Sequence, residues 1–295
     1  MPIADCLPFF PVPYVSTHDG LDLAYERSGG GTPALLIHAN GFCKEMWRPV
    51  SRPLIGLDQV AVDQRGHGWS AVGLPPFDWW DLARDLLAVV ATLGLSEPRI
   101  GVGHSSGGAA LAMAEILRPG TWDRLVLIEP ITFPGPFGRN EDHPLVIGAG
   151  RRRDVFDDRD QALASYRGRG PFARWTDEAL ALYVEHAFHD GGDGLRHLAC
   201  RPDTEAEFYR MATAHGAWDR LGEIRCPVTV VVGTDSGSHP PAFAEALAAQ
   251  FGVGHFVSIP DGTHFVPMEQ PEAIAEVIRG VIGDVGHRMA PTGDR

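Results

Sequence analysis

Short apolar segments alternate with helical patterns along most of this 295-residue chain, and this alternation limits its fold more than any other feature. The apolar segments are rich in Val, Ile and Leu, as in strands that are buried on both faces of a sheet. Such alternation is typical of a mostly parallel sheet with helices on both sides. We therefore predict an α/β fold with a doubly wound sheet. Strands are expected at residues 21–26 (as an edge strand), 34–38, 59–63, 99–102, 124–128, 228–232 and 255–259, and helices at 78–93, 241–251 and 271–282.

One long segment interrupts this alternation. Between residues 131 and 218 the strand signal nearly disappears, and helical patterns dominate at 159–167, 177–188 and 203–214. The segment leaves the sheet after one strand and returns before the next, so it should lie over the strand ends, where ligands bind in open α/β sheets. The expected organisation is a core formed by residues 1–130 and 219–295, with residues 131–218 inserted as a helical cap.

The hexapeptide Gly103-His104-Ser105-Ser106-Gly107-Gly108 stands between a predicted strand and a helical pattern of small residues. Its Gly-x-Ser-x-Gly order in that setting is typical of a nucleophile elbow. A chain that turns directly from strand to helix strains the central residue and brings it close to its neighbours, and Gly103 and Gly107 leave the necessary room. An ordinary turn is the alternative, because the chain holds 35 glycines. The flanking strand and helix favour the elbow and predict Ser105 as a nucleophile.

The composition excludes several classes of function. A net charge of -13 argues against nucleic-acid binding, which needs clustered Lys and Arg. No apolar run is long enough to span a membrane, and the first residues lack the basic stretch of a signal peptide. We expect a cytoplasmic protein without a membrane or nucleic-acid partner. The four cysteines are Cys6, Cys43, Cys200 and Cys226. They are scattered and lack the paired spacing of a zinc or redox site, so no metal site is predicted.

Four segments together resemble enzymes of the α/β-hydrolase fold. They are residues 38–42 (His-Ala-Asn-Gly-Phe), residues 63–70 (Asp-Gln-Arg-Gly-His-Gly-Trp-Ser), the elbow, and residues 262–265 (Gly-Thr-His-Phe). The resemblance extends from about Asp19 to Ile282, nearly the whole chain. It implies a serine hydrolase that needs no cofactor, and it says little about the substrate.

In such enzymes a serine attacks only with the help of a base. His264 is the candidate base, because it lies between the last predicted strand and the last helix, in the chain order serine, acid, histidine that this fold uses. The alternative for His264 is a turn histidine without a catalytic role. Position, and not residue type, selects it among the 13 histidines.

The acid has two candidates. Most relatives carry an Asp in the loop after strand 228–232, and Asp235 lies close to that place, although Ser236 stands at the step where the acid is expected. Glu129 directly follows strand 124–128, where haloalkane dehalogenases and certain lactone hydrolases carry a Glu. An unpaired buried charge is costly, and a histidine that becomes imidazolium would be a partner for Glu129. We favour Glu129, since Asp235 also suits a turn-forming role.

The resemblance also implies an oxyanion hole and a substrate pocket. The oxyanion donors should be the backbone N–H of Ser106, which follows the nucleophile, and that of Asn40, after the second predicted strand. Relatives usually have His-Gly where this chain has His38-Ala39. Aromatic side chains near these loops are expected to line an apolar pocket, with ordinary core packing as the alternative: Phe42, Phe133, Trp218 and Phe265.

The expected reaction is hydrolysis of a carboxylic ester or lactone through an acyl-enzyme, with a small, apolar molecule as the substrate. Serine at position 105, where dehalogenases and epoxide hydrolases carry Asp, argues against both of those activities. Three alternatives stay open: a carbon-carbon bond hydrolase acting on a diketone, a cofactor-free perhydrolase, and a ligand-binding receptor on a hydrolase scaffold. Whether the chain forms a homodimer is also left open.

Overall fold

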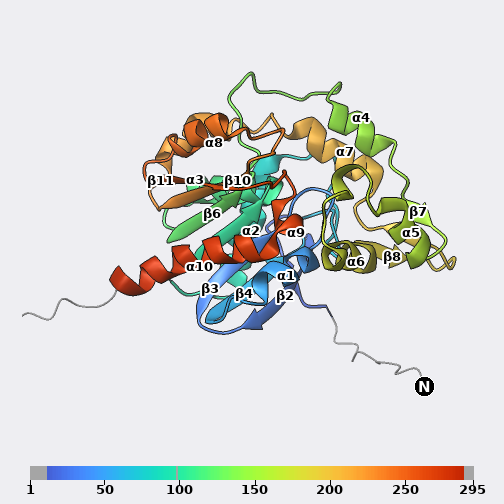
Figure 1. Cartoon of the computed structure of the whole chain (residues 1–295), viewed down its shortest axis with the longest axis horizontal. Helices are drawn as coiled ribbons and strands as arrows, with labels where there is room; N and C mark the ends of the chain where they lie inside the picture. The colour runs from blue at the N-terminus through green and yellow to red at the C-terminus, as the bar shows by residue number, and fades with distance from the viewer. Residues whose placement is uncertain (1–11, 98, 289–295) are drawn as a thin grey trace, which may run out of the picture.

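The computed structural model describes residues 12–97 and 99–288, with only the backbone given for residues 284–288. An eight-stranded sheet forms its centre, in the order β1-β2-β4-β3-β5-β6-β10-β11 (Figure 1). All neighbours from β4 to β11 are parallel, whereas β2 pairs antiparallel with β1 and β4. The strands are β1 (Tyr14–Ser16), β2 (Asp22–Gly29), β3 (Thr32–Ile37), β4 (Leu57–Val62), β5 (Ile100–His104), β6 (Arg124–Ile128), β10 (Val228–Gly233) and β11 (Gly254–Ile259).

The predicted α/β class is confirmed, and each expected strand has a counterpart from β2 to β11. The expectation that residues 21–26 form an edge strand is wrong, because β1 pairs with the outer side of β2. β1 is only three residues long and buries only Val15, so it carries no periodic signal that the sequence could reveal.

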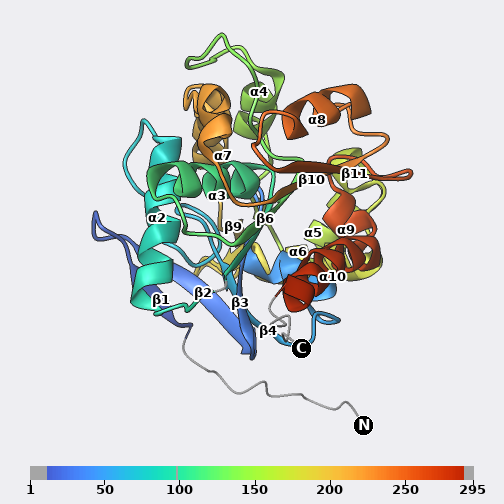
Figure 2. The same ribbon diagram turned by 90° about the vertical axis from the view of Figure 1, so that its left-hand side faces the viewer.

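Helices cover both faces of the sheet because successive side chains of a strand point to opposite sides. In β3, Leu35 and Ile37 join the core under α2 (Trp79–Thr92), α3 (Ser106–Leu117) and α8 (Pro241–Ala248). Ala34 and Leu36 join the opposite core, under α1 (Arg48–Ser51) and α10 (Pro271–Arg288). Figure 2 shows α2 and α3 on one side of the sheet and α10 on the other.

The segment expected as a helical cap, residues 131–218, lies between β6 and β10 and contains a small sheet as well as helices (Figure 1). The sequence did not reveal this sheet, because its three strands are only two or three residues long. It also did not reveal α4, which has only seven residues. The helices are α4 (Pro144–Gly150), α5 (Arg159–Tyr166), η2 (Gly170–Phe172), α6 (Asp177–His186) and α7 (Pro202–Met211); the strands pair in the order β7 (Val155–Phe156), β9 (Arg196–Leu198), β8 (Phe188–Asp190). A further helix, η3 (Ala217–Glu223), crosses the expected boundary at residue 218.

Aromatic and aliphatic side chains of this segment pack on loops that follow the sheet strands. They share a core with Phe42 and Met46, which follow β3, and with Met268, which follows β11. The segment therefore lies at the carboxyl edge of the parallel sheet.

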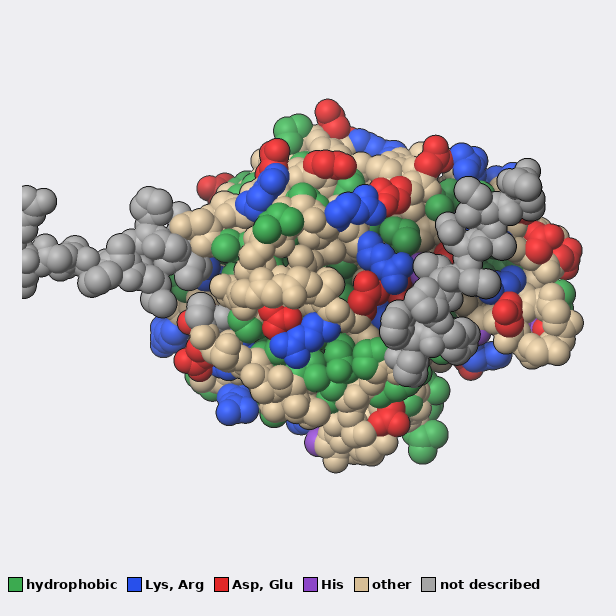
Figure 3. Space-filling model, turned by 90° about the horizontal axis from the view of Figure 1, so that it is seen from below, with side chains coloured by type: hydrophobic (Ala, Val, Ile, Leu, Met, Phe, Trp, Pro, Cys, Tyr) green, Lys and Arg blue, Asp and Glu red, His purple; other side chains and the backbone are tan. Residues whose placement is uncertain are grey.

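Lys and Arg side chains are interspersed with Asp and Glu on the face shown in Figure 3, and no large patch of one sign covers it. Within the described ranges, none of the helices combines the length and apolar character needed to cross a membrane.

Candidate active site

Ser105 occupies a sharp turn between β5 and α3. Its backbone has φ 57° and ψ -114°, a strained conformation for a residue with a side chain. Its N–H donates to the carbonyl of Ile128 on the neighbouring strand, with an N···O distance of 2.9 Å. A Cβ atom at Gly103 would lie 2.6 Å from the Gly107 carbonyl, and one at Gly107 would lie 2.3 Å from the Ile37 carbonyl oxygen. Only glycine fits at these two positions, and the packing holds the serine in its strained turn.

His264 approaches Ser105 from the loop between β11 and α9 (Val266–Glu269). Its Nε2 lies 3.1 Å from the Ser105 Oγ, so it can accept the hydroxyl proton. The backbone carbonyl of His264 accepts a 2.8 Å hydrogen bond from His104 Nε2. Burial, and secondarily the field of His264, lowers the pKa of His104 to about 3, so His104 is a neutral donor near neutral pH. The same loop is held by Thr263, whose hydroxyl donates to the Glu269 carboxylate at 2.6 Å.

Glu129 directly follows β6 and is fully buried. Its Oε2 lies 3.2 Å from His264 Nδ1, and its Oε1 accepts a 2.9 Å hydrogen bond from the Gly233 N–H. Burial alone would raise the pKa of Glu129, but hydrogen bonds and favourable charge interactions from His239 and His264 outweigh it and hold that pKa far below its usual range. The carboxylate is therefore ionised and aimed at His264.

Asp235, the other candidate acid, lies elsewhere. Its side chain is half exposed and pairs with Arg174, with 2.9 Å between Oδ2 and Nη1. Among the described residues, His264 Nδ1 has only Glu129 and the Ser238 hydroxyl, at 3.1 Å, as hydrogen-bond partners. The geometry brings Glu129, and not Asp235, to the histidine.

The two predicted oxyanion donors flank the elbow. Ser106 is the first residue of α3, so its N–H has no partner within the helix. Asn40 lies between β3 and η1 (Lys44–Trp47), and in the described part of the chain its backbone N–H is likewise unbonded. Gln64 links the end of β3 to the elbow, because its Nε2 donates to the His38 carbonyl at 2.6 Å and to the Ser106 hydroxyl at 3.0 Å.

The rest of the Asn40 loop is committed to other contacts. The Asn40 side-chain amide donates to the Glu205 carbonyl on α7 at 3.1 Å, and the Gly41 N–H donates to His67 Nε2 at 2.9 Å. Burial lowers the pKa of His67 to about 3, which keeps this ring neutral and its Nε2 able to accept. Among the described residues, the backbone N–H of Asn40 has no partner and is available to an oxyanion.

The four predicted pocket residues fall into two groups. The rings of Phe42 and Phe265 have centroids 6.2 Å apart, and Phe265 lies perpendicular to His264 at 5.3 Å. Phe133 and Trp218 instead stack on Phe243 of α8, at 5.4 Å and 5.9 Å. The first pair lies beside His264, together with Trp175 of the inserted segment.

Sequence reasoning missed the polar side chains that surround Glu129. Ser236 donates to Glu129 Oε2 at 2.6 Å, Ser238 lies 3.4 Å from the same oxygen, and His239 Nδ1 lies 2.9 Å from it. All three come from the loop in which relatives usually carry the acid. The one available signal was Ser236 at the expected position of the acid.

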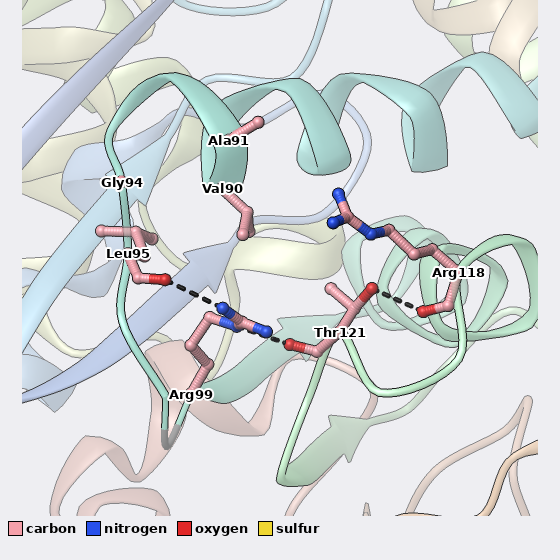
Figure 4. Close-up of a pocket in the computed structure, with 7 residues that line it drawn as sticks. All are labelled: Val90, Ala91, Gly94, Leu95, Arg99, Arg118 and Thr121. Carbon is pink, nitrogen blue, oxygen red and sulfur yellow. Dashed lines mark hydrogen bonds between the residues drawn. The ribbon is translucent and has the colours of Figure 1, made fainter.

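A separate hollow of about 330 Å³ lies between the ends of α2 and α3 (Figure 4). Arg99 in its wall precedes β5, whereas Ser105 follows β5, so the hollow lies at the opposite edge of the sheet from the serine. The Arg99 guanidinium already donates to the carbonyls of Leu95 and Thr121 at 2.9 Å and 2.8 Å. The hollow therefore plays no part in this site.

Known proteins resemble this chain in sequence and in fold. The sequence model of the alpha/beta hydrolase family matches residues 34–277. A protein from Azorhizobium caulinodans that bears the name carbamate hydrolase RutD is 25% identical over 93% of this chain and 99% of its own length. The bifunctional esterase/perhydrolase DCH of Acinetobacter calcoaceticus is 26% identical over 88% of this chain and 96% of its own.

Solved structures share the fold. The peroxisomal alpha-beta-hydrolase Lpx1 from Saccharomyces cerevisiae superposes with a TM-score of 0.76 at 21% identity, covering 95% of this chain and 86% of its own. The resemblance in the four sequence segments is thus confirmed. The chain belongs to the alpha/beta hydrolase family, and it is an enzyme of the hydrolytic type.

Proposed function

We propose that this enzyme is a serine hydrolase that cleaves a carboxylic ester or lactone through an acyl-enzyme intermediate. One observation carries the proposal: a continuous chain of contacts joins Ser105 Oγ to His264 Nε2 at 3.1 Å and His264 Nδ1 to Glu129 Oε2 at 3.2 Å. Nucleophile, base and acid in hydrogen-bond contact form the arrangement that activates a serine.

In the proposed reaction, the Ser105 Oγ attacks the substrate carbonyl carbon while its proton passes to His264 Nε2. The negative charge that develops on the carbonyl oxygen is stabilised by the N–H groups of Asn40 and Ser106. Glu129 stabilises the imidazolium, which then protonates the leaving alcohol oxygen as the bond breaks. Water, deprotonated by His264, attacks the acyl carbon, and the carboxylic acid leaves as Ser105 regains its proton.

The surroundings favour an apolar acyl or alcohol group. Phe42, Phe265 and Trp175 form an aromatic cluster beside His264. Residues 131–218 pack over the carboxyl edge of the sheet, and we propose that they act as the cap of the substrate site. Apolar walls with a few aimed polar groups are typical of sites for small molecules.

A panel of acyl esters, lactones, carbamates and diketones tests the proposal with the wild-type enzyme and Ser105→Ala. We expect turnover of esters or lactones by the wild type, and loss of kcat by a factor on the order of 10⁵–10⁶ in the variant. Equal turnover by both proteins would refute Ser105 as the nucleophile. Cleavage of diketones alone would assign the enzyme to carbon-carbon bond hydrolysis.

Perhydrolysis is a second candidate, favoured by the similarity to the esterase/perhydrolase of Acinetobacter calcoaceticus. Hydrogen peroxide would replace water as the attacking group on the acyl-enzyme, and a peracid would leave in place of the acid. Peracid formation from a carboxylic acid and peroxide, abolished by Ser105→Ala, would support this activity. Its absence in an enzyme that hydrolyses esters would exclude it.

A further inference from the structure

Glu129 contacts a second histidine besides His264. His239, in the loop between β10 and α8, is fully buried, and its Nδ1 lies 2.9 Å from Glu129 Oε2. Its Nε2 lies 2.9 Å from the carbonyl oxygen of Pro130, the residue after Glu129. The His239 ring thus contacts both the Glu129 carboxylate and the backbone carbonyl of the next residue.

Both ring nitrogens of His239 face oxygen atoms that accept hydrogen bonds. A carbonyl oxygen cannot donate, so Nε2 must carry a proton to bond with Pro130. The Glu129 carboxylate is ionised and also only accepts, so a neutral ring would place the lone pair of Nδ1 against Oε2 at 2.9 Å. Nδ1 is also hydrogen-bonded to the Ser238 hydroxyl at 3.1 Å, and that oxygen can accept from the same protonated nitrogen. A doubly protonated ring satisfies both short contacts.

The surroundings of His239 suit a cation that is paired with Glu129. Its ring lies against Phe133 and Phe243, with centroids 5.2 Å and 5.5 Å away. A buried charge is tolerated when a partner of opposite sign contacts it and the remaining polar atoms are bonded, as they are here. The other titratable group facing the ring is His264, at 6.2 Å between centroids.

Titratable groups farther from Glu129 make contacts elsewhere. His104, from β5, contacts His264 rather than His239, with ring centroids 5.2 Å apart. Asp235, from the same loop as His239, pairs outward with Arg174. Among the described residues, the titratable side chains that contact Glu129 are therefore His239 and His264.

We propose that His239 is a positively charged positioning residue, which forms a buried ion pair with Glu129 and fixes the carboxylate against His264. The proposal rests on the proposed function, in which Glu129 is the acid of the site. Because His239 already compensates part of the charge of Glu129, it sets how strongly that carboxylate stabilises a proton on His264.

His215 is a matched control within the same chain. It is also buried and stacked on an aromatic ring, that of Trp79, and its Nε2 lies 3.1 Å from the Ile131 carbonyl oxygen. Its Nδ1, however, accepts a hydrogen bond from the Ala217 N–H at 3.1 Å. One ring nitrogen donates and the other accepts, so His215 should be neutral where His239 is charged.

Nitrogen-15 NMR of the histidine rings in the full-length wild-type protein measures directly which ring nitrogens carry protons. At about pH 7.5 we expect both nitrogens of His239 to carry protons and only Nε2 of His215 to do so. Assignment through backbone correlations makes this result independent of any variant. A singly protonated His239 ring would overturn the proposal.

A kinetic measurement tests the consequence for the base. In His239→Gln, which keeps a donor but loses the charge, the acid limb of kcat/KM should move up by about one pH unit, and kcat should fall while KM changes little. His215→Gln should leave the acid limb in place. An unmoved acid limb in a His239→Gln protein that still reacts with a fluorophosphonate would contradict the proposal. Failure of the wild type to react with that probe would instead count against Ser105 as the nucleophile.

Discussion

At the scale of single residues, the position of Glu129 helps to orient His264, the proposed base. It has φ 50° and sits where β6 ends, and its N–H donates to the Val231 carbonyl of β10 at 2.9 Å. A carboxylate buried there needs donors, and the chain supplies them from the neighbouring strand end and from His264. The orientation of His264 therefore depends on a residue that the sheet itself fixes in place.

Substitution of the two candidate acids separates their roles. Glu129→Gln keeps the shape of the side chain but removes the charge that stabilises the imidazolium, so kcat should fall by about 10⁴. Asp235→Asn changes only a half-exposed pair with Arg174 and should leave kcat close to that of the wild type. Steady-state kinetics on the best ester measures both. The reverse pattern, with loss confined to Asp235→Asn, would move the acid to the loop.

Residue by residue, the sequence pointed to the three contacting side chains that have local signals. Ser105 stands in a recognisable elbow, His264 follows the last strand, and Glu129 is an acid after an apolar strand. The environment of Glu129 could not be predicted, because His239 reaches it only through the pairing of β6 with β10, whose elements lie about a hundred residues apart.

At the scale of elements, the strand-turn-helix unit β5-Ser105-α3 depends on close contact with β3. The Gly107 Cα approaches the end of β3 so closely that an added methyl group would lie 2.3 Å from the Ile37 carbonyl oxygen. This contact brings the Asn40 loop beside the elbow. It links the packing of the sheet to the positions of the proposed oxyanion donors, Asn40 and Ser106.

Two glycine substitutions test this packing. Gly107→Ala should lower the free energy of unfolding by about 3 kcal/mol, because backbone atoms must move to admit the methyl group. The control is Gly280→Ala in α10, where no heavy atom lies within 4 Å of the added Cβ. It should raise the free energy of unfolding by about 0.5 to 1 kcal/mol, since alanine favours a helix. Urea denaturation followed by circular dichroism measures both, and equal stability of the two variants would contradict the close contact.

The elements of the main sheet were predictable because parallel strands are apolar over most of their length. In residues 131–218 the sequence predicted α5, α6 and α7 but not the sheet of β7, β8 and β9. Strands of two or three residues hold too few side chains for a periodic pattern. Their pairing comes from packing within the inserted segment, which local sequence does not encode.

At the scale of the whole molecule, buried histidines make the fold sensitive to acid. Burial lowers the pKa of His38 and His215 to about 4 and that of His67 and His104 to about 3. In the unfolded chain these groups titrate near 6.5, so below that pH the unfolded state binds more protons and stability falls. Burial raises the pKa of Asp85 to about 6 and also raises that of Glu115, and these two carboxyls act in the opposite direction. They stand against five histidines, because burial lowers the pKa of His186 as well.

We therefore expect the protein to lose most of its stability between about pH 6.5 and pH 4.5, at a rate of roughly 4 kcal/mol per pH unit. Urea midpoints measured across this range test the expectation. Midpoints should change little from about pH 7 to pH 8, where these histidines are neutral in both states. A midpoint that is constant from pH 7 down to pH 5 would contradict the burial of neutral histidines.

The central claim is that Ser105 is a nucleophile activated by His264 and Glu129. Reaction with a fluorophosphonate, followed by mass spectrometry of the intact protein and its peptides, tests that claim most directly. We predict one adduct per chain, located on Ser105, absent from Ser105→Ala, and formed much more slowly by His264→Ala and Glu129→Gln than by the wild type. A wild-type protein that stays unmodified, or a Ser105→Ala variant that is modified equally well, would contradict the account.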